Sequence, residues 1–147
     1  MKIFVMFADE DTQQAGEILK HLRLLEKVEF DVISQNDMLA GSCIKGFFEE
    51  HIGNANFIIL MLSIDFDLDF WLEKIPKEKP ILAIYLRHLD TALYLKNIRH
   101  THFILINKTP TKKTDDYYSK ILQSLKTKLI SKASSHNIND ELLLWFF

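Results

Sequence analysis

The sequence predicts a flavodoxin-like α/β domain, with a five-stranded parallel sheet in the order 2-1-3-4-5 and helices on both faces. Short apolar segments alternate with longer segments of helical period, which is typical of parallel strands joined by helices. Two of the apolar segments, 3–7 and 57–62, contain no polar residue, as expected of strands buried on both faces. The chain has 147 residues, of which 48% are hydrophobic, so it can form one domain with a substantial core.

The first half of the chain contains three predicted strands and two predicted helices. The first strand, Ile3 to Phe7, is followed by an acidic turn and by a helix that Asp11 is expected to cap. The second strand covers residues 29–34, and the second helix, 42–53, is expected to be capped by its first residue, a serine. The third strand, 57–62, is the most apolar and is therefore the predicted centre of the sheet.

The second half of the chain adds a short helix, two strands and a long final helix. These elements are predicted at 71–75, at 81–86, at 103–106 and from about Asp115 onward. A loop with three aspartates, 63–70, precedes the short helix, and prolines soon after that helix prevent it from continuing.

The chain is expected to consist of a domain and a C-terminal tail. The predicted domain covers residues 1–132, and the tail, 133–147, ends in six consecutive apolar residues. An exposed run of this kind would be an unusual apolar patch. We therefore expect the tail, or an extra helix formed by it, to pack on the domain or on a partner subunit.

Composition excludes several classes of function. The formal charge of −2, from 18 basic and 20 acidic residues, gives no electrostatic footprint for nucleic acid. The apolar run 57–62 is far too short to span a membrane, and the N-terminal apolar segment is too short for the core of a signal peptide. A single cysteine, Cys43, fits a reducing compartment. The expectation is a soluble cytoplasmic protein with no nucleic-acid or membrane partner.

The predicted topology also locates a ligand site. In an open parallel sheet of this order, ligands bind beyond the carboxyl ends of strands 1 and 3, where the strand order switches. In this chain the crevice would be formed by residues 7–11, by the loop 36–41 and by residues 63–73.

A receiver-like phosphoacceptor domain is one interpretation of this crevice. The acidic turn 9–11 has oxygen ligands for a hard cation, and Lys108 follows the fifth strand. The third strand, however, ends in Ser63 rather than in aspartate, and Asp65 comes two residues late. This interpretation is therefore the least favoured.

Four segments carry a resemblance to a known family. They are the first strand with its acidic turn, the loop Asn36 to Gly41, the passage from Asn54 to Phe66, and the fourth strand with its turn, Ile81 to Asp90. In this order and spacing they resemble the TIR (Toll/interleukin-1 receptor) domain of the bacterial type, over roughly residues 2–130. The loop Asn36 to Gly41 is similar to the BB loop of that family.

The resemblance implies one of two functions. Many bacterial TIR domains cleave NAD⁺ at the nicotinamide–ribose bond, by hydrolysis or cyclisation, in defence or signalling. Other members are catalytically silent and signal by self-association. NAD⁺ is then a substrate, no cofactor is implied, and the protein partners would be other TIR domains.

The resemblance also implies the residues of the site. The family uses a glutamate in the helix after the third strand, where a carboxylate stabilises the positive charge that develops on the ribose. Glu73 is the first candidate, although it follows Trp71 by two positions instead of the four or five usual in the family, and Glu78 is the second candidate. The residues expected to contact the substrate are Phe7, Ala8, Asp11, Asp37, Leu39, Gly41, Ser63 and Trp71.

No metal site is expected from the sequence. His100 and His102 alternate near the fifth strand, but no third ligand follows at a recognisable spacing. Cys43 has no identifiable histidine partner, so it is expected to be a small buried residue.

Overall fold

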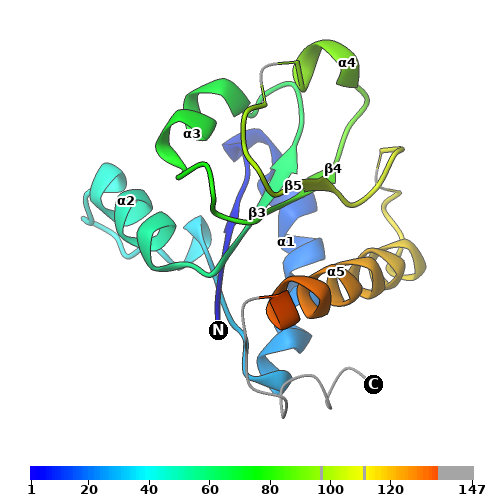
Figure 1. Ribbon diagram of the computed structural model, residues 1–147, viewed down its shortest axis with the longest axis horizontal. Coiled ribbons are helices and arrows are strands. Elements are labelled where there is room, and N and C mark those ends of the chain that lie inside the picture. The colour runs from blue at the N-terminus through cyan, green and yellow to red at the C-terminus, as the bar shows by residue number, and fades with distance from the viewer. Residues whose placement is uncertain (97, 111, 136–147) are drawn as a thin grey trace.

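The sheet has the predicted flavodoxin-like order. The computed structural model describes residues 1–96, 98–110 and 112–135 (Figure 1). The strands are β1 (Lys2–Met6), β2 (Asp31–Ser34), β3 (Phe57–Leu62), β4 (Ile81–Tyr85) and β5 (Phe103–Leu105). They pair in parallel in the order β2-β1-β3-β4-β5. The predicted fold class is therefore confirmed.

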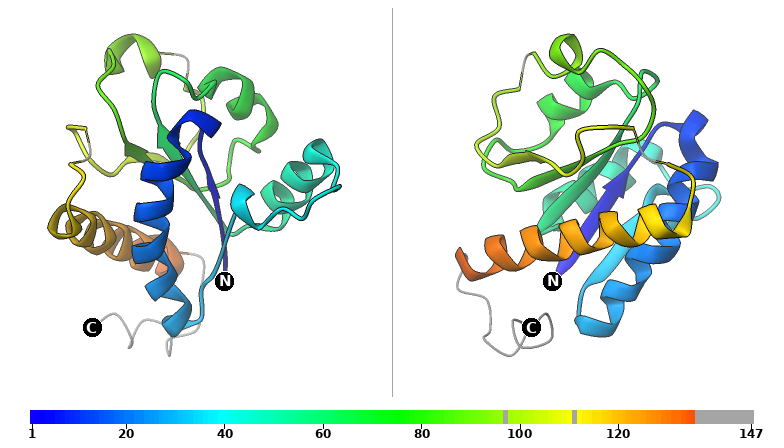
Figure 2. Two further views of the ribbon diagram at one scale, coloured as in Figure 1. Left: turned by 180° about the vertical axis from the view of Figure 1, so that it is seen from behind. Right: turned by 90° about the vertical axis from the view of Figure 1, so that its right-hand side faces the viewer.

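Helices cover both faces of this sheet. In the described part of the chain they are α1 (Thr12–Leu22), α2 (Ile44–Asn54), α3 (Leu68–Lys74), α4 (Thr91–Tyr94) and α5 (Asp115–Ser135). Helices α1 and α5 lie on one face, and α2 and α3 lie on the other (Figure 2). Short 3-10 turns follow strands β1 and β2 and helix α1, at η1 (Asp9–Asp11), η3 (Gln35–Asp37) and η2 (Arg23–Val28). None of the described helices is both long enough and apolar enough to cross a membrane.

The central strands supply side chains to two separate cores. All six residues of β3 are buried, and alternate residues point to opposite faces, as the pleat of a strand requires. Phe57, Ile59 and Met61 pack with α1 and α5. Ile58 and Leu60 pack with α2 and α3. The polar groups at the carboxyl ends of β1, β3 and β4 are thus held by strands that are buried on both sides.

Several local predictions were wrong at the element ends. Asp11 precedes α1, but its side chain makes no capping hydrogen bond, because it turns toward the end of the sheet. Helix α2 begins at Ile44 rather than at Ser42, and Cys43 in the N-cap position is exposed rather than buried. Strand β2 begins two residues later than predicted, after Glu29 adopts a left-handed φ of 68°.

Two further differences concern the later part of the chain. Helix α4 was not predicted. It begins where the Asp90 carboxylate accepts a hydrogen bond from the Leu93 N–H at 3.2 Å. The first three residues of the predicted tail, 133–147, end α5, and the rest of the tail, whose packing was predicted, lies outside the described residues.

Candidate functional site

A crevice lies at the carboxyl ends of β1 and β3, the switch point of the sheet. Its volume is about 420 Å³. The pairing of residues 3–6 with 57–60 brings the ends of these two strands to one edge. Gln35 joins the neighbouring turn to β1, since its Oε1 accepts a hydrogen bond from the Phe7 N–H at 3.0 Å. The crevice is lined by Phe7, Ala8, Asp9, Glu10, Gln35, Asn36, Met38, Ile44, Phe48, Asp65, Phe66, Asp67 and Trp71.

Four carboxylates line the crevice, and they differ in their partners. Asp65 pairs with Arg87, and Asp67 caps α3 by accepting a hydrogen bond from the Phe70 N–H at 3.2 Å. Asp9 and Glu10 are exposed, and neither carboxylate has a hydrogen bond or ion pair with any described residue. These two are therefore the carboxylates available to a ligand.

A closed polar network lies beside the crevice. The buried Asp11 carboxylate accepts hydrogen bonds from Ser63 Oγ and, at 2.7 Å, from Arg87 Nε. Arg87 Nη2 also donates to Ser63 Oγ at 3.1 Å and pairs with Asp65. The hydrogen bonds with Asp65 and Asp11 raise the pKa of the Arg87 guanidinium above its ordinary value, against the opposing effect of burial. The network therefore joins the ends of β1, β3 and β4.

The predicted substrate contacts divide between these two regions. Phe7, Ala8 and Trp71 line the crevice. Asp11 and Ser63 do not line it, because their side-chain oxygens are used in the closed network. The contacts expected from residues 7, 8 and 71 are thus geometrically available, whereas those from 11 and 63 are not.

The predicted BB loop contributes different residues from those expected. Asp37 accepts a hydrogen bond from the Ser34 N–H at 2.8 Å and pairs with Arg23 at 3.1 Å, so it stabilises the turn after β2. Leu39 is 78% exposed, and Gly41 has a φ of 83°, the left-handed conformation that glycine tolerates. Asn36 and Met38, from the same loop, line the crevice in their place.

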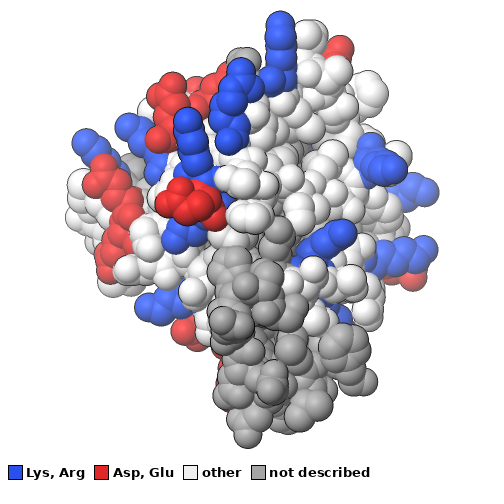
Figure 3. Space-filling model, viewed as in Figure 1, with Lys and Arg blue, Asp and Glu red and all other residues white. Residues whose placement is uncertain are grey.

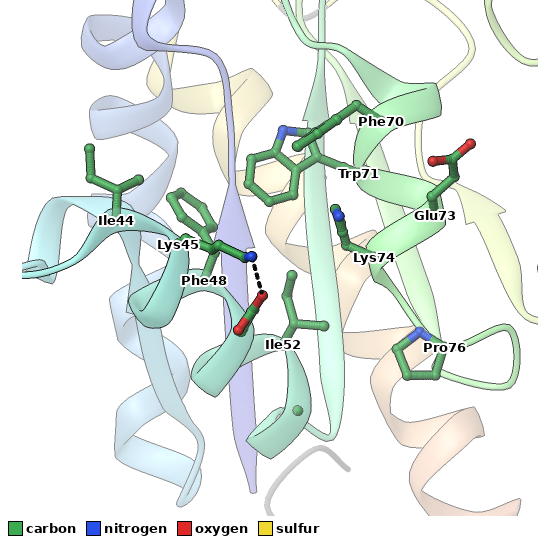
Figure 4. A pocket seen from close by; sticks show the side chains of 11 residues that line it. Ile44, Lys45, Phe48, Ile52, Phe70, Trp71, Glu73, Lys74 and Pro76 are labelled. Carbon is green, nitrogen blue, oxygen red and sulfur yellow. Dashed lines mark ion pairs between the residues drawn. The ribbon is translucent and has the colours of Figure 1, made fainter.

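The two candidate catalytic glutamates lie outside the crevice. Glu73 lines a neighbouring groove, and its carboxylate points away from Trp71 (Figure 4). Residues two apart on a helix are separated by about 200°, so Glu73 does not follow Trp71 into the crevice, although both residues line the groove. Glu78 is exposed in the turn before β4, at the amino ends of the strands, opposite the crevice.

The neighbouring groove lies between α2 and α3 and is mostly apolar. Its volume is about 750 Å³. The Trp71 ring packs against Phe48, with centroids 4.7 Å apart, and against Phe70 at 5.1 Å. Lys74 lies over the Phe70 ring at 5.4 Å. Acidic and basic side chains are interspersed on the surface that α2 and α3 form (Figure 3). Trp71 lines both hollows.

Metal-ligating side chains do not gather in the described residues, where no group of three or more His, Cys, Asp or Glu is placed to hold an ion. His100 Nε2 lies 2.8 Å from the carbonyl oxygen of Ile75, and its Nδ1 is buried without a hydrogen-bond partner in the described structure. This ring joins the segment before β5 to the end of α3.

Comparison with known proteins supports the fold. A scan against protein-family models and a search of the curated proteins give no match. Among solved structures, the chain is similar to the CMP N-glycosidase BcmB of Clostridium botulinum, with a TM-score of 0.53 and 14% identity, over 86% of this chain and 99% of that one. It is also similar to the diflavin flavoprotein A3 of Nostoc sp., with a TM-score of 0.52 and 16% identity, over 93% of this chain and 98% of that one. At these identities the likeness shows the flavodoxin-like fold alone.

Arg87 is the site residue that the sequence interpretation missed. A signal for it was present, because the buried ends of β1 and β3 carry a carboxylate and a hydroxyl that need a partner. A basic residue two positions beyond β4 arrives at the same edge of a parallel sheet. This reasoning needs the sheet order, which no local motif supplies.

Proposed function

We propose that the protein cleaves the bond between a ribose and its base, with the nicotinamide of NAD⁺ as the leaving base. The observation that carries the proposal is the crevice at the switch point, where Asp9 and Glu10, two carboxylates unpaired among the described residues, line the same hollow as Trp71. Two further observations support it. The TIR resemblance implies cleavage of the nicotinamide–ribose bond, and a protein of the same fold is a CMP N-glycosidase.

The chemistry suits carboxylates beside an aromatic wall. The bond from C1′ of the ribose to the nicotinamide nitrogen breaks, and its electron pair goes to the ring, so the cationic ring leaves as neutral nicotinamide. Positive charge develops on C1′, where a carboxylate stabilises it. Water then bonds to C1′ and gives one proton to a carboxylate or to the solvent. An indole face stabilises the cationic ring before cleavage.

The geometry favours Asp9 and Glu10 over Glu73 for this role. Asp9 and Glu10 line the crevice, whereas Glu73 lines the groove on the other side of Trp71. Carboxylates accept hydrogen bonds from ribose hydroxyls and can bring negative charge beside C1′. Glu73 and Glu78 are the alternative catalytic carboxylates, and the nicotinamide-release experiment tests them together with Asp9 and Glu10.

The test is release of nicotinamide from NAD⁺, measured at high protein concentration for the wild type and matched amide variants. We expect Glu10→Gln or Asp9→Asn to lower kcat/KM by about 100-fold, the effect of losing a group that stabilises transition-state charge. Glu73→Gln should change it less than about twofold. The control is Glu50→Gln, the same charge change on an exposed residue of α2 outside the crevice.

Each other outcome has a defined meaning. Loss of turnover only in Glu73→Gln would move the chemistry to the groove between α2 and α3. Loss only in Glu78→Gln would move it to the amino end of the sheet. Absence of nicotinamide release from the wild type would contradict the enzymatic proposal.

A second candidate function is a catalytically silent TIR module that signals by self-association. The observation that favours it is the apolar groove of about 750 Å³, with Phe70 48% exposed at its rim. An exposed apolar surface of this kind is typical of protein contacts. This candidate predicts concentration-dependent assembly without loss of NAD⁺.

A further inference from the structure

We infer that the crevice selects a cationic riboside without a 5′-phosphomonoester, such as nicotinamide riboside, over its 5′-monophosphate. This inference rests on the proposed function and concerns the substrate class of the same site. It follows from the charges around the crevice, from its aromatic wall and from its size.

The lining of the crevice carries negative charge without a matching cation. Four carboxylates contribute to it, at positions 9, 10, 65 and 67, and none of the described residues that line it is lysine or arginine. Arg87, the cation of the adjoining polar network, is bound to both Asp11 and Asp65. A phosphate in the crevice would therefore meet carboxylates and no unshared guanidinium.

Tyr94 lies close to these carboxylates. Its hydroxyl donates to the carbonyl oxygen of Phe66 at 2.7 Å, directly behind the crevice loop. Burial raises the pKa of the Tyr94 phenol well above its ordinary value, and the charges of Asp67, Asp11 and Asp69 raise it further. A second anion at this end of the sheet is thus opposed by the same carboxylates.

The aromatic wall and the size of the crevice fit the uncharged part of the ligand and its cationic ring. Trp71 presents a half-buried indole, the best side chain for a cation–π contact. The volume of about 420 Å³ lies toward the lower end of ligand pockets, which run from about 300 to 1,000 Å³. The nicotinamide riboside portion of a ligand fits this space, and the adenylate portion of NAD⁺ would extend outside it.

The experiment compares kcat/KM for nicotinamide riboside, nicotinamide mononucleotide and NAD⁺. A phosphomonoester carries close to two negative charges at pH 7. We expect the riboside to be preferred over the mononucleotide by at least about tenfold at low salt, and the preference to shrink at about 1 M salt, where the Debye length is only about 3 Å.

A matched pair of variants identifies the source of the selection. Asp67→Asn removes a charge from the crevice while keeping an N-cap for α3, since asparagine caps helices as well as aspartate does. Asp90→Asn makes the same change at the cap of α4, outside the crevice. We expect Asp67→Asn to reduce the riboside preference severalfold and Asp90→Asn to leave it unchanged.

The outcomes separate this inference from the proposed function. Equal or faster cleavage of the mononucleotide, or of CMP, would overturn the inference while keeping an N-glycosidase. If no compound is cleaved, the proposed function fails, and calorimetric binding of the riboside and the mononucleotide then decides the inference. Tighter binding of the mononucleotide would overturn it.

Discussion

Two hollows meet at Trp71, and they are opposite in character. The crevice at the end of the sheet is lined by four carboxylates, and the groove between α2 and α3 is lined mainly by apolar rings and aliphatic side chains. The crevice is built on strand ends that are buried on both sides, whereas the groove is built on two helices that pack on one face. The first suits a small polar ligand and the second suits another protein surface.

The difference explains why one aromatic residue fits both proposed functions. Trp71 follows the cap of α3 by four residues, so its ring stands between the strand ends and the facing helix α2. The presence of an aromatic residue and a nearby glutamate in the sequence does not show whether the crevice or the groove is the functional site. Variants that change one hollow at a time can distinguish the two.

The largest expected effect comes from opening the network beside the crevice. Arg87→Ala leaves the Asp11 carboxylate, whose side chain is 2% exposed, without its cation. The Arg87 side chain is 42% exposed, so water partly replaces it, and we expect the free energy of unfolding to fall by about 2 kcal/mol in urea titrations.

Two further variants isolate the cause. Arg99→Ala removes an exposed guanidinium whose contact is the neighbouring Ile98 carbonyl oxygen, and it should change stability by less than about 0.5 kcal/mol. Asp11→Asn combined with Arg87→Ala should recover part of the loss, because the uncompensated charge is then gone. A strictly additive double variant would contradict the buried-charge explanation.

An intermediate effect is expected in the groove. Phe70→Ser removes the edge contact with Trp71 and the cation–π contact with Lys74, which together contribute about 1.5 kcal/mol. The same change should weaken any self-association through the groove, measured by sedimentation velocity over a range of concentrations. Turnover in the crevice should be retained.

Leu93→Ser provides the control for this variant. Leu93 is 70% exposed on α4 and does not line the groove. Equal loss of association in both variants would show that general surface hydrophobicity, rather than the groove, drives assembly.

The smallest expected effect is a dependence of stability on pH. The pKa of Tyr94 is raised in the folded protein above its ordinary value of 10.0, chiefly by burial. The neutral phenol therefore contributes stability that is fully present below pH 10 and is lost as the pH rises above it. Tyr94→Phe should cost about 1 kcal/mol at pH 8, through the lost hydrogen bond to Phe66.

The difference between wild type and Tyr94→Phe should reverse at high pH. Ionisation of the unfolded wild type lowers its stability by about 1.4 kcal/mol for each pH unit above 10, and the variant lacks this phenol. Urea titrations at pH 8 and pH 11 measure the change. A constant difference at the two values would mean that folding does not perturb this phenol.

The sequence predicted the sheet well because its evidence is local and repeated. Apolar runs show where buried strands lie. The bounds of β3 were predicted correctly, and β4 and β5 each end one residue before the predicted end. Side-chain partners were predicted less well. Asp11 was expected to cap a helix, but its partner Arg87 lies 76 residues away, and no local pattern shows such a contact.

The position of Glu73 shows a second limit of prediction from the sequence. Its element was predicted, and helix geometry alone indicates that a residue two positions after Trp71 lies on nearly the opposite side of the helix; Glu73 accordingly lines the groove with Trp71 but not the crevice. What the sequence could not show is which hollow each of the two residues would face. That depends on the packing of α3 against α2, which is a property of the assembled domain.

The network of Asp11, Ser63 and Arg87 also has a consequence for the time course of folding. Its hydrogen bonds join residues 52 and 76 positions apart, on strands that must already be in register before the side chains meet. Because closing such long loops has a large entropic cost, we expect these contacts to form late in folding. Interactions absent from the transition state change the rate of unfolding more than the rate of folding. We therefore expect the network to slow unfolding, so that its loss would raise the unfolding rate more than it lowers the folding rate.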